Sequence, residues 1–105
     1  MRAGIQDQIR RRLEHNRTAL VSALSGGPAR VLDSEGGWYA VVGLPESLPD
    51  EELVLRLLDR DGVLAHPGYF YDFPTGEVLV LSLLTQPEVF AEGAGRLAAR
   101  VQSEL

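Results

Sequence analysis

Apolar side chains recur at helical spacing through the first part of the chain. Apart from the adjacent Leu20 and Val21, they lie three, four or seven residues apart, and they are Ile5, Ile9, Leu13, Leu20, Val21 and Leu24. This pattern predicts one amphipathic helix over residues 3–24, which Gly26, Gly27 and Pro28 end. At about 1.5 Å per residue the helix is about 30 Å long, so we expect it to lie across something larger than its own domain.

Alternation replaces this spacing from Gly37 onward. The stretch GWYAVVGL predicts a strand with Trp38, Ala40, Val42 and Leu44 on one face and Tyr39 and Val41 on the other. The stretch EVLVLSLL, residues 77–84, predicts another apolar strand. Because both faces of each strand are apolar, we expect both faces of the sheet to be covered at least in part.

Two more helices and a short strand complete the pattern. Acidic residues at 50–52 start a helix that Gly62 ends, and its apolar side chains are Leu53, Val54, Leu57 and Leu58. A short strand over 63–65 leads into the turn His66-Pro67-Gly68. Thr85 and Glu88 form a predicted capping box around Pro87, and the closing helix carries Phe90, Ala94, Leu97, Ala98 and Val101 on its apolar face.

The element order predicts the fold class. Helix, strand, helix, strand, strand and helix favour an α/β (α+β) two-layer sandwich: a small mixed sheet with helices on one face, preceded by a long N-terminal helix. The 105 residues suit a single domain, with 1–27 as a connecting helix and 36–105 as the α/β core.

Charge is unevenly distributed along the chain. Residues 1–30 hold six Arg against Asp7 and Glu14, which gives a charge of +4. The remaining residues carry −9, so the net charge of the chain is −5. Because the basic residues lie on a helical pattern rather than in a flexible arm, we expect no nucleic acid partner. All ten basic residues are Arg, so the chain has no lysine amine for chemistry.

The absence of cysteine limits the kinds of site that the chain can hold. Without Cys there is neither a disulfide nor a thiolate metal site, and we expect a cytoplasmic protein. No apolar run reaches membrane-spanning length, so we expect no membrane partner.

Residues that carry chemistry are few. His15 lies on the charged helix and reads as solvated, whereas His66 is near Asp72 in a loop that also holds Tyr69, Phe70, Tyr71 and Phe73. A His66–Asp72 pair is conceivable, but no Ser or Cys nucleophile motif accompanies it, and a structural or ligand-lining histidine is the simpler interpretation. Two His residues without a carboxylate cluster predict no metal site.

Five segments of the chain form a recognisable series. The long helix carries an R-x-x-x-x-N-x-x-x-L pattern at Arg11, Asn16 and Leu20. The other four segments are GGWYAVVGLP, LLDRDGVLAHPGYFYDF, VLVLSL and EVFAEGAGRLAARV. In this order and spacing, the five resemble the C-terminal small domain of fold type I pyridoxal-phosphate enzymes, the class I/II aminotransferases.

The resemblance implies a domain of a larger enzyme that transfers an amino group between an amino acid and a 2-oxo acid. In that family the large domain holds pyridoxal phosphate and the lysine, and the small domain closes over the substrate. The chain would then be inactive alone, with the missing large domain as its partner and a homodimer as the parent assembly. His66, Tyr69 and Tyr71 would line the mouth of the substrate cleft.

One position departs from the family. In the family, the strand that corresponds to VLVLSL usually carries an Arg that binds the substrate carboxylate. That Arg lies two residues before a Ser, and the residue two before Ser82 in this chain is Val80. Valine carries no charge and donates no hydrogen bond, so the substrate class does not follow from the resemblance.

Two alternatives stay open at this point. A free-standing module of ferredoxin-like or regulatory type, which binds a small molecule or a partner, would show the same alternation of strands and helices. An autonomous enzyme that depends on His66 is the other.

Overall fold

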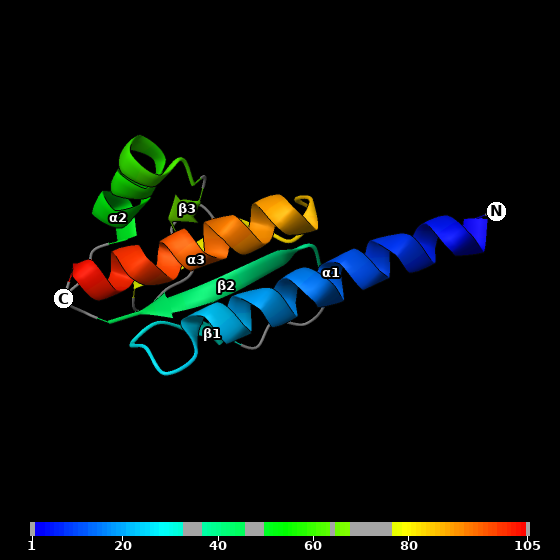
Figure 1. Cartoon of the computed structure of the whole chain (residues 1–105), viewed down its shortest axis with the longest axis horizontal. Helices are drawn as coiled ribbons and strands as arrows, with labels where there is room; N and C mark the ends of the chain where they lie inside the picture. The colour runs from blue at the N-terminus through cyan, green and yellow to red at the C-terminus, as the bar shows by residue number, and fades with distance from the viewer. Residues whose placement is uncertain (1, 33–36, 46–49, 64, 68–76, 105) are drawn as a thin grey trace.

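A computed structural model describes residues 2–32, 37–45, 50–63, 65–67 and 77–104. Its elements follow one another along the chain as shown in Figure 1. They are α1 (Arg2–Leu24), β1 (Arg30–Leu32), β2 (Tyr39–Leu44), α2 (Asp50–Arg56), the π-helical turn η1 (Leu57–Asp61), β3 (His66–Pro67), β4 (Glu77–Ser82) and α3 (Pro87–Ser103).

The four described strands form one sheet in the order β1-β2-β4-β3. The fold class is confirmed, with one correction: every pairing in this sheet is antiparallel, so the sheet is not mixed. The physical reason is the place of β4. The crossover through α2 makes β3 run parallel to β2, but β4 inserts between them and is antiparallel to both. Strand β1, which the sequence pattern did not predict, extends the sheet beyond β2.

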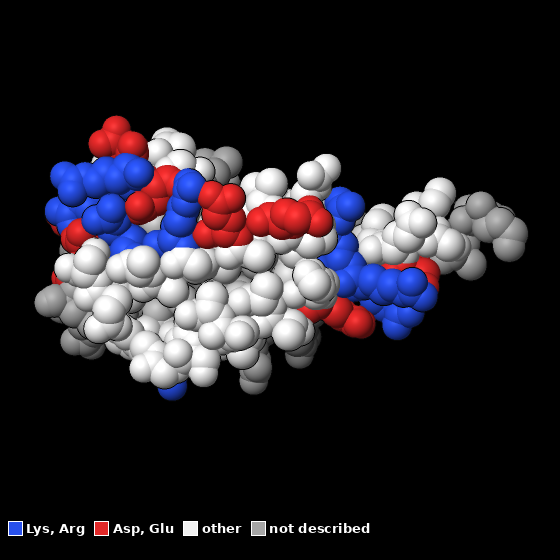
Figure 2. Space-filling view, viewed as in Figure 1, with Lys and Arg blue, Asp and Glu red and all other residues white. Residues whose placement is uncertain are grey.

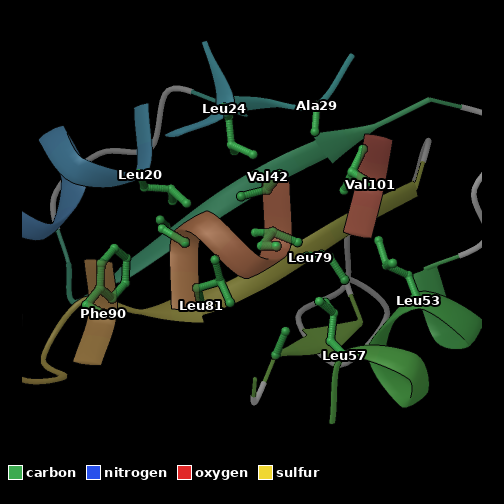
Figure 3. Close-up of a cluster of buried hydrophobic side chains, with 14 of the residues drawn as sticks. Leu20, Leu24, Ala29, Val42, Leu53, Leu57, Leu79, Leu81, Phe90 and Val101 are labelled. Carbon is green, nitrogen blue, oxygen red and sulfur yellow. The ribbon is translucent and has the colours of Figure 1, made fainter. Parts of the chain in front are cut away.

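The helices pack on one face of this sheet and enclose a single core (Figure 3). Alternate residues of β2 and β4, such as Val42 and Leu79, point into it. Figure 3 shows side chains from all three helices meeting there. The helical members are Leu20, Leu24, Leu53, Phe90, Ala94, Leu97 and Val101, with Leu57 added from η1.

The predicted first helix is confirmed as α1, and Gly26, with a φ of 80°, follows its end in the left-handed region that glycine favours. Its N-terminal half extends beyond the sheet and the other helices (Figure 1). The start of α3 differs from prediction. Gln86 is the N-cap and makes no side-chain capping bond, so the capping box at Thr85 does not form, and Pro87 opens the helix.

Buried side chains also occupy the second face of the sheet. Val41, Val78 and Val80 are 6%, 5% and 1% exposed, and none belongs to the core cluster under the helices. The sequence pattern led us to expect that another domain would cover this face, but these three side chains are already buried within this chain. In the described part of the chain, no helix is both long enough and apolar enough to cross a membrane.

Candidate functional site

His66 and Val80 are direct partners on neighbouring strands. His66 of β3 lies opposite Val80 of β4, and Val80 also lies opposite Val41 of β2, so the three form a row across the sheet. Partners in an antiparallel pair project to the same face, which here is the face away from the helices. The structure thus brings together two of the four predicted site residues. Tyr69 and Tyr71 lie outside the described residues.

The row of His66, Val80 and Val41 is mostly apolar, and its valines are buried. Val80 is 1% exposed, so a ligand in solution cannot reach its side chain in this chain. His66 is half-buried on the edge strand and is the polar member of the row. An imidazole can donate or accept a hydrogen bond, so polar contact with a ligand along this row would come from His66.

A groove on the helical side of the sheet has a volume of about 340 Å³. It lies between α3 and the segment from Gly62 to His66, and Gly93 of α3 leaves room there. Its floor is apolar, with Leu81, Phe90 and Leu97, and its polar lining residues on the helical side are Thr85, Glu92 and Arg96. His66 and Ser82 also border the groove, although their pairing register assigns both to the opposite face, that of Val80. The sequence contained no signal for this groove, because it exists only where α3 passes a segment about 30 residues earlier.

The charged residues of the groove are engaged with the protein itself. Arg96 forms an ion pair with Glu92 and donates a 2.7 Å hydrogen bond to the main-chain oxygen of Asp61. Among the lining residues that the structure describes, this is the one guanidinium. The groove therefore offers an apolar floor and hydroxyl groups rather than a ready binding site for phosphate.

A half-buried ion pair joins η1 to α3. Arg100 of α3 holds both carboxylate oxygens of Asp61 in η1, with its Nε 2.9 Å from Oδ2 and its Nη2 3.2 Å from Oδ1. The hydrogen bond from Arg100 lowers the pKa of the Asp61 carboxyl, and the same bond raises the pKa of Arg100. Glu104 accepts from Arg56 and lies 3.6 Å from Arg100, which ties α2 and η1 to the end of α3.

The described residues offer no ligand set for a metal, and the sequence lacks the lysine that pyridoxal phosphate needs. Within the described ranges no group of three His, Cys, Asp or Glu residues is placed to hold a metal ion. Pyridoxal phosphate does not fit either, since the sequence has no Lys to bind its aldehyde and the guanidinium of the groove is paired.

No protein-family model matches the sequence, and no curated protein matches it. Solved structures do match, and the first is an aspartate aminotransferase from Rhodobacter sphaeroides, with a TM-score of 0.80 at 24% identity over 93% of this chain. A kynurenine aminotransferase from Pyrococcus horikoshii has a TM-score of 0.76 at 24% identity over 94% of this chain. A probable N-succinyldiaminopimelate aminotransferase from Thermus thermophilus has a TM-score of 0.69 at 28% identity over 89%.

The chain has the fold of part of an aminotransferase. It covers 25%, 26% and 24% of these three proteins, so it spans about a quarter of the length of the chains it matches. This confirms the resemblance seen in the order of the sequence segments. It also agrees with the small size expected of the C-terminal domain. The aminotransferase-like domain thus carries the row of His66, Val80 and Val41 on one face of its sheet and the groove on the other.

Proposed function

We propose that this chain is the C-terminal small domain of a pyridoxal-phosphate-dependent aminotransferase. The enzyme would transfer an amino group between an amino acid and a 2-oxo acid, and this domain would close over the substrate cleft. The observation that carries the proposal is the fold match over 93% of this chain but 25% of the aspartate aminotransferase. A domain that corresponds to a quarter of an enzyme would depend on the remaining part for its activity.

Pyridoxal phosphate, when the larger part holds it, supplies the group that carries the amino nitrogen between substrates. The residues of this chain would contribute the wall of the cleft. His66, half-buried on the edge strand, would face the cleft, and Val41 and Val80, buried within this chain beside it, would support that wall from behind. A homodimer is the proposed assembly of the parent enzyme.

Binding of the substrate carboxylate has to differ from the usual arrangement. Val80 offers no donor and is covered, and an isolated carboxylate without a donor in a closed site costs several kcal/mol. We place the polar contact at His66 and at the loop with Tyr69 and Tyr71, or at an Arg of the larger part.

The test uses the protein expressed from the complete reading frame that contains these 105 residues. We expect stoichiometric pyridoxal phosphate and measurable transamination of an α-amino acid. His66→Ala and Tyr71→Phe should each raise KM, whereas His15→Ala, at an exposed site on α1, should leave kcat/KM unchanged. A complete protein that binds no pyridoxal phosphate would refute the assignment, and unchanged KM values in both loop variants would remove the loop from the site.

A second candidate function is that of a free-standing module that binds a small molecule, and the groove favours this function. The groove has a volume of about 340 Å³, which falls within the range of ligand pockets, roughly 300–1,000 Å³. Ligand-induced chemical shift changes confined to groove residues such as Phe90 and Thr85, in a protein without transaminase activity, would support this second function over the first.

A further inference from the structure

Asp61 and Gly62 form the sole Asp-Gly step in this sequence, which contains no Asn-Gly step. Such a step can react with itself, because the main-chain nitrogen of the glycine can attack the side-chain carboxyl of the aspartate. Glycine has no Cβ, so it leaves the attacking nitrogen less hindered than any other residue would. The structure places this step at the end of η1, where the chain turns toward β3.

The reaction at an Asp-Gly step closes a five-membered ring. A bond forms between the glycine nitrogen and Cγ of the aspartate, and the carboxyl OH leaves as water together with the hydrogen of that nitrogen. Water then opens the cyclic imide at one of its two carbonyl carbons. Opening at one carbon restores aspartate, and opening at the other gives isoaspartate, in which the main chain runs through Cγ.

Hydrogen bonds hold both reacting groups of this step in the folded chain. Arg100 of α3 binds both carboxylate oxygens of Asp61, with its Nε 2.9 Å from Oδ2 and its Nη2 3.2 Å from Oδ1. The main-chain N–H of Gly62 is donated to the oxygen of Leu57 within the turn. Attack of the nitrogen on Cγ therefore requires both contacts to open, because the two atoms must approach in a defined orientation.

Arg100 also keeps the carboxyl of Asp61 in its less reactive form. Its hydrogen bond lowers the pKa of Asp61, so the group is a carboxylate at neutral pH. A carboxylate has no OH to lose and is a poor electrophile. The side chains of Arg100 and Asp61 are 18% and 17% exposed, so little water reaches the pair to compete for the guanidinium. Loss of Arg100 would free the carboxyl and favour its reactive acid form.

Isomerisation would change the attachment of η1 to α3. Figure 2 shows arginine and acidic side chains gathered over this part of the molecule, where Arg96 donates a 2.7 Å hydrogen bond to the main-chain oxygen of Asp61. In isoaspartate the former main-chain carbonyl becomes a free carboxylate, and the former side-chain carboxylate becomes a neutral amide carbonyl. Arg100 would thus lose the carboxylate that binds it through two oxygens, which is the stronger kind of contact.

We propose that Asp61–Gly62 is a latent isoaspartate site, which the contact between Asp61 and Arg100 keeps closed in the folded chain. Opening of this contact lets the imide form, and the isoaspartate that follows releases η1 from α3. Gly62 is exposed, so water reaches the imide and hydrolyses it. The proposal does not depend on the aminotransferase function, since the chain reacts with itself and with water alone.

Ageing of the purified chain at neutral pH tests the proposal. Isoaspartate at position 61 is measured by mass spectrometry after proteolysis, with electron-transfer fragmentation to locate it. We expect the wild type to react at least about tenfold more slowly when folded than in guanidinium chloride, because attack requires local opening. Folded Arg100→Gln should react at least about fivefold faster than the folded wild type. Equal rates in the folded and unfolded wild type, or in the wild type and folded Arg100→Gln, would overturn the proposal.

Two control variants separate this contact from other causes. Asn16→Leu removes hydrogen bonds far from Asp61 and leaves Arg100 in place, so it should react like the wild type while circular dichroism shows it folded. Acceleration equal to that of Arg100→Gln would overturn the proposal, because general loss of stability would then explain the reaction. Arg60→Gln, at an exposed site beside Asp61, should also keep the wild-type rate. Equal acceleration there would assign the protection to nearby positive charge instead.

A milder variant keeps the test decisive if Arg100→Gln does not fold. Arg100→Lys retains the positive charge but cannot bind both carboxylate oxygens, so it should react faster than the wild type. A wild-type rate in this variant would contradict the protective role of the paired contact.

The modified chain gives an independent measurement. The isoaspartyl form is separated from the aspartyl form by chromatography, and hydrogen exchange is compared between the two. Exchange of the amides at residues 57–63 should be at least about tenfold faster in the isoaspartyl form, whereas exchange in α1 should be similar in both. Equal exchange at residues 57–63 would refute the release of η1.

Discussion

The side-chain amide of Asn16 donates a 2.9 Å hydrogen bond to the main-chain oxygen of Leu83, 67 residues further along the chain. Its second bond, 2.7 Å to the oxygen of Thr85, makes one fully buried side chain hold α1 to the segment between β4 and α3. The amide oxygen of Asn16 has no partner in the described part of the chain. Its role is therefore that of a donor to two carbonyl groups.

Asn16→Leu should lower the free energy of unfolding by about 2 kcal/mol. Leucine has a similar size, so the loss reflects the Leu83 carbonyl left without its donor in a buried place. Urea denaturation of the 105-residue chain measures it. His15→Leu, at the exposed neighbouring position, is the control and should change the free energy by less than about 0.5 kcal/mol. Equal effects of the two variants would show that the two hydrogen bonds contribute nothing.

The pair of Asp61 and Arg100 makes stability depend on acid pH. The hydrogen bond from Arg100 lowers the pKa of Asp61 in the folded chain. The ion pair therefore stabilises the fold fully at pH values above the pKa of Asp61 in the unfolded chain, about 3.9. This stabilisation is lost as the pH falls through the lower pKa that Asp61 has in the folded chain. Urea midpoints should therefore drop below about pH 4, and Asp61→Asn should make that drop shallower. The matched control is Asp59→Asn, at an exposed site in the same π-helical turn, which should keep the wild-type pH profile. Identical profiles for the Asp61 variant and the wild type would rule out this pair as the source.

An arginine cannot be restored at position 80 without cost. Val80→Arg would bury a guanidinium at a site that is 1% exposed, so it should destabilise the chain by about 3 kcal/mol or more. Ser82→Arg is the matched control, since Ser82 lies on the same strand and face but is exposed, and it should cost less than about 1 kcal/mol. Chemical denaturation compares the two. Equal costs would mean that the covered environment of Val80 does not exist in solution.

Two glycines should respond to alanine with opposite signs. Gly62 ends η1 with a φ of 67°, so Gly62→Ala should destabilise the chain by about 1 kcal/mol. Gly95 lies inside α3 and is exposed, and an added Cβ meets nothing within 4 Å, so Gly95→Ala should stabilise it by about 0.5–1 kcal/mol. Thermal unfolding followed by circular dichroism separates the two outcomes, and a destabilised Gly95 variant would contradict the placement of α3.

The 105-residue chain by itself should not fix pyridoxal phosphate. It has no lysine, so after its N-terminal amine is blocked the absorption spectrum of added pyridoxal phosphate should stay that of the free aldehyde. Reductive treatment followed by mass spectrometry gives an independent measurement. A stoichiometric adduct on the blocked chain would show that another group of this chain binds the aldehyde.

Local patterns in the sequence predicted much of the fold. The spacing from Ile5 to Leu24 predicted α1, and the alternation around Val42 predicted a strand with both faces apolar. These features are readable because helical and strand periodicity depend on neighbours a few residues away. The order of the segments also led to the aminotransferase resemblance, which the solved structures confirm.

Pairing between distant segments was decided by the tertiary structure alone. Strand β1 has three residues and no alternation long enough to predict, and it exists because Val31 finds Val42 as a partner. The insertion of β4 between β2 and β3 made the sheet antiparallel, and it placed His66 opposite Val80. Register of this kind depends on contacts between segments far apart in the chain, which no local period encodes.

Burial separated the residues that the sequence had treated alike. Ile5, Ile9, Leu20 and Leu24 share one helical stripe in the sequence, yet the first two are exposed and the last two are buried. The amino acid pattern determines which face of α1 is apolar, because that follows from helical geometry. Where that face is covered depends on where α3 begins and on how Asn16 orients α1, and these are properties of the packed chain.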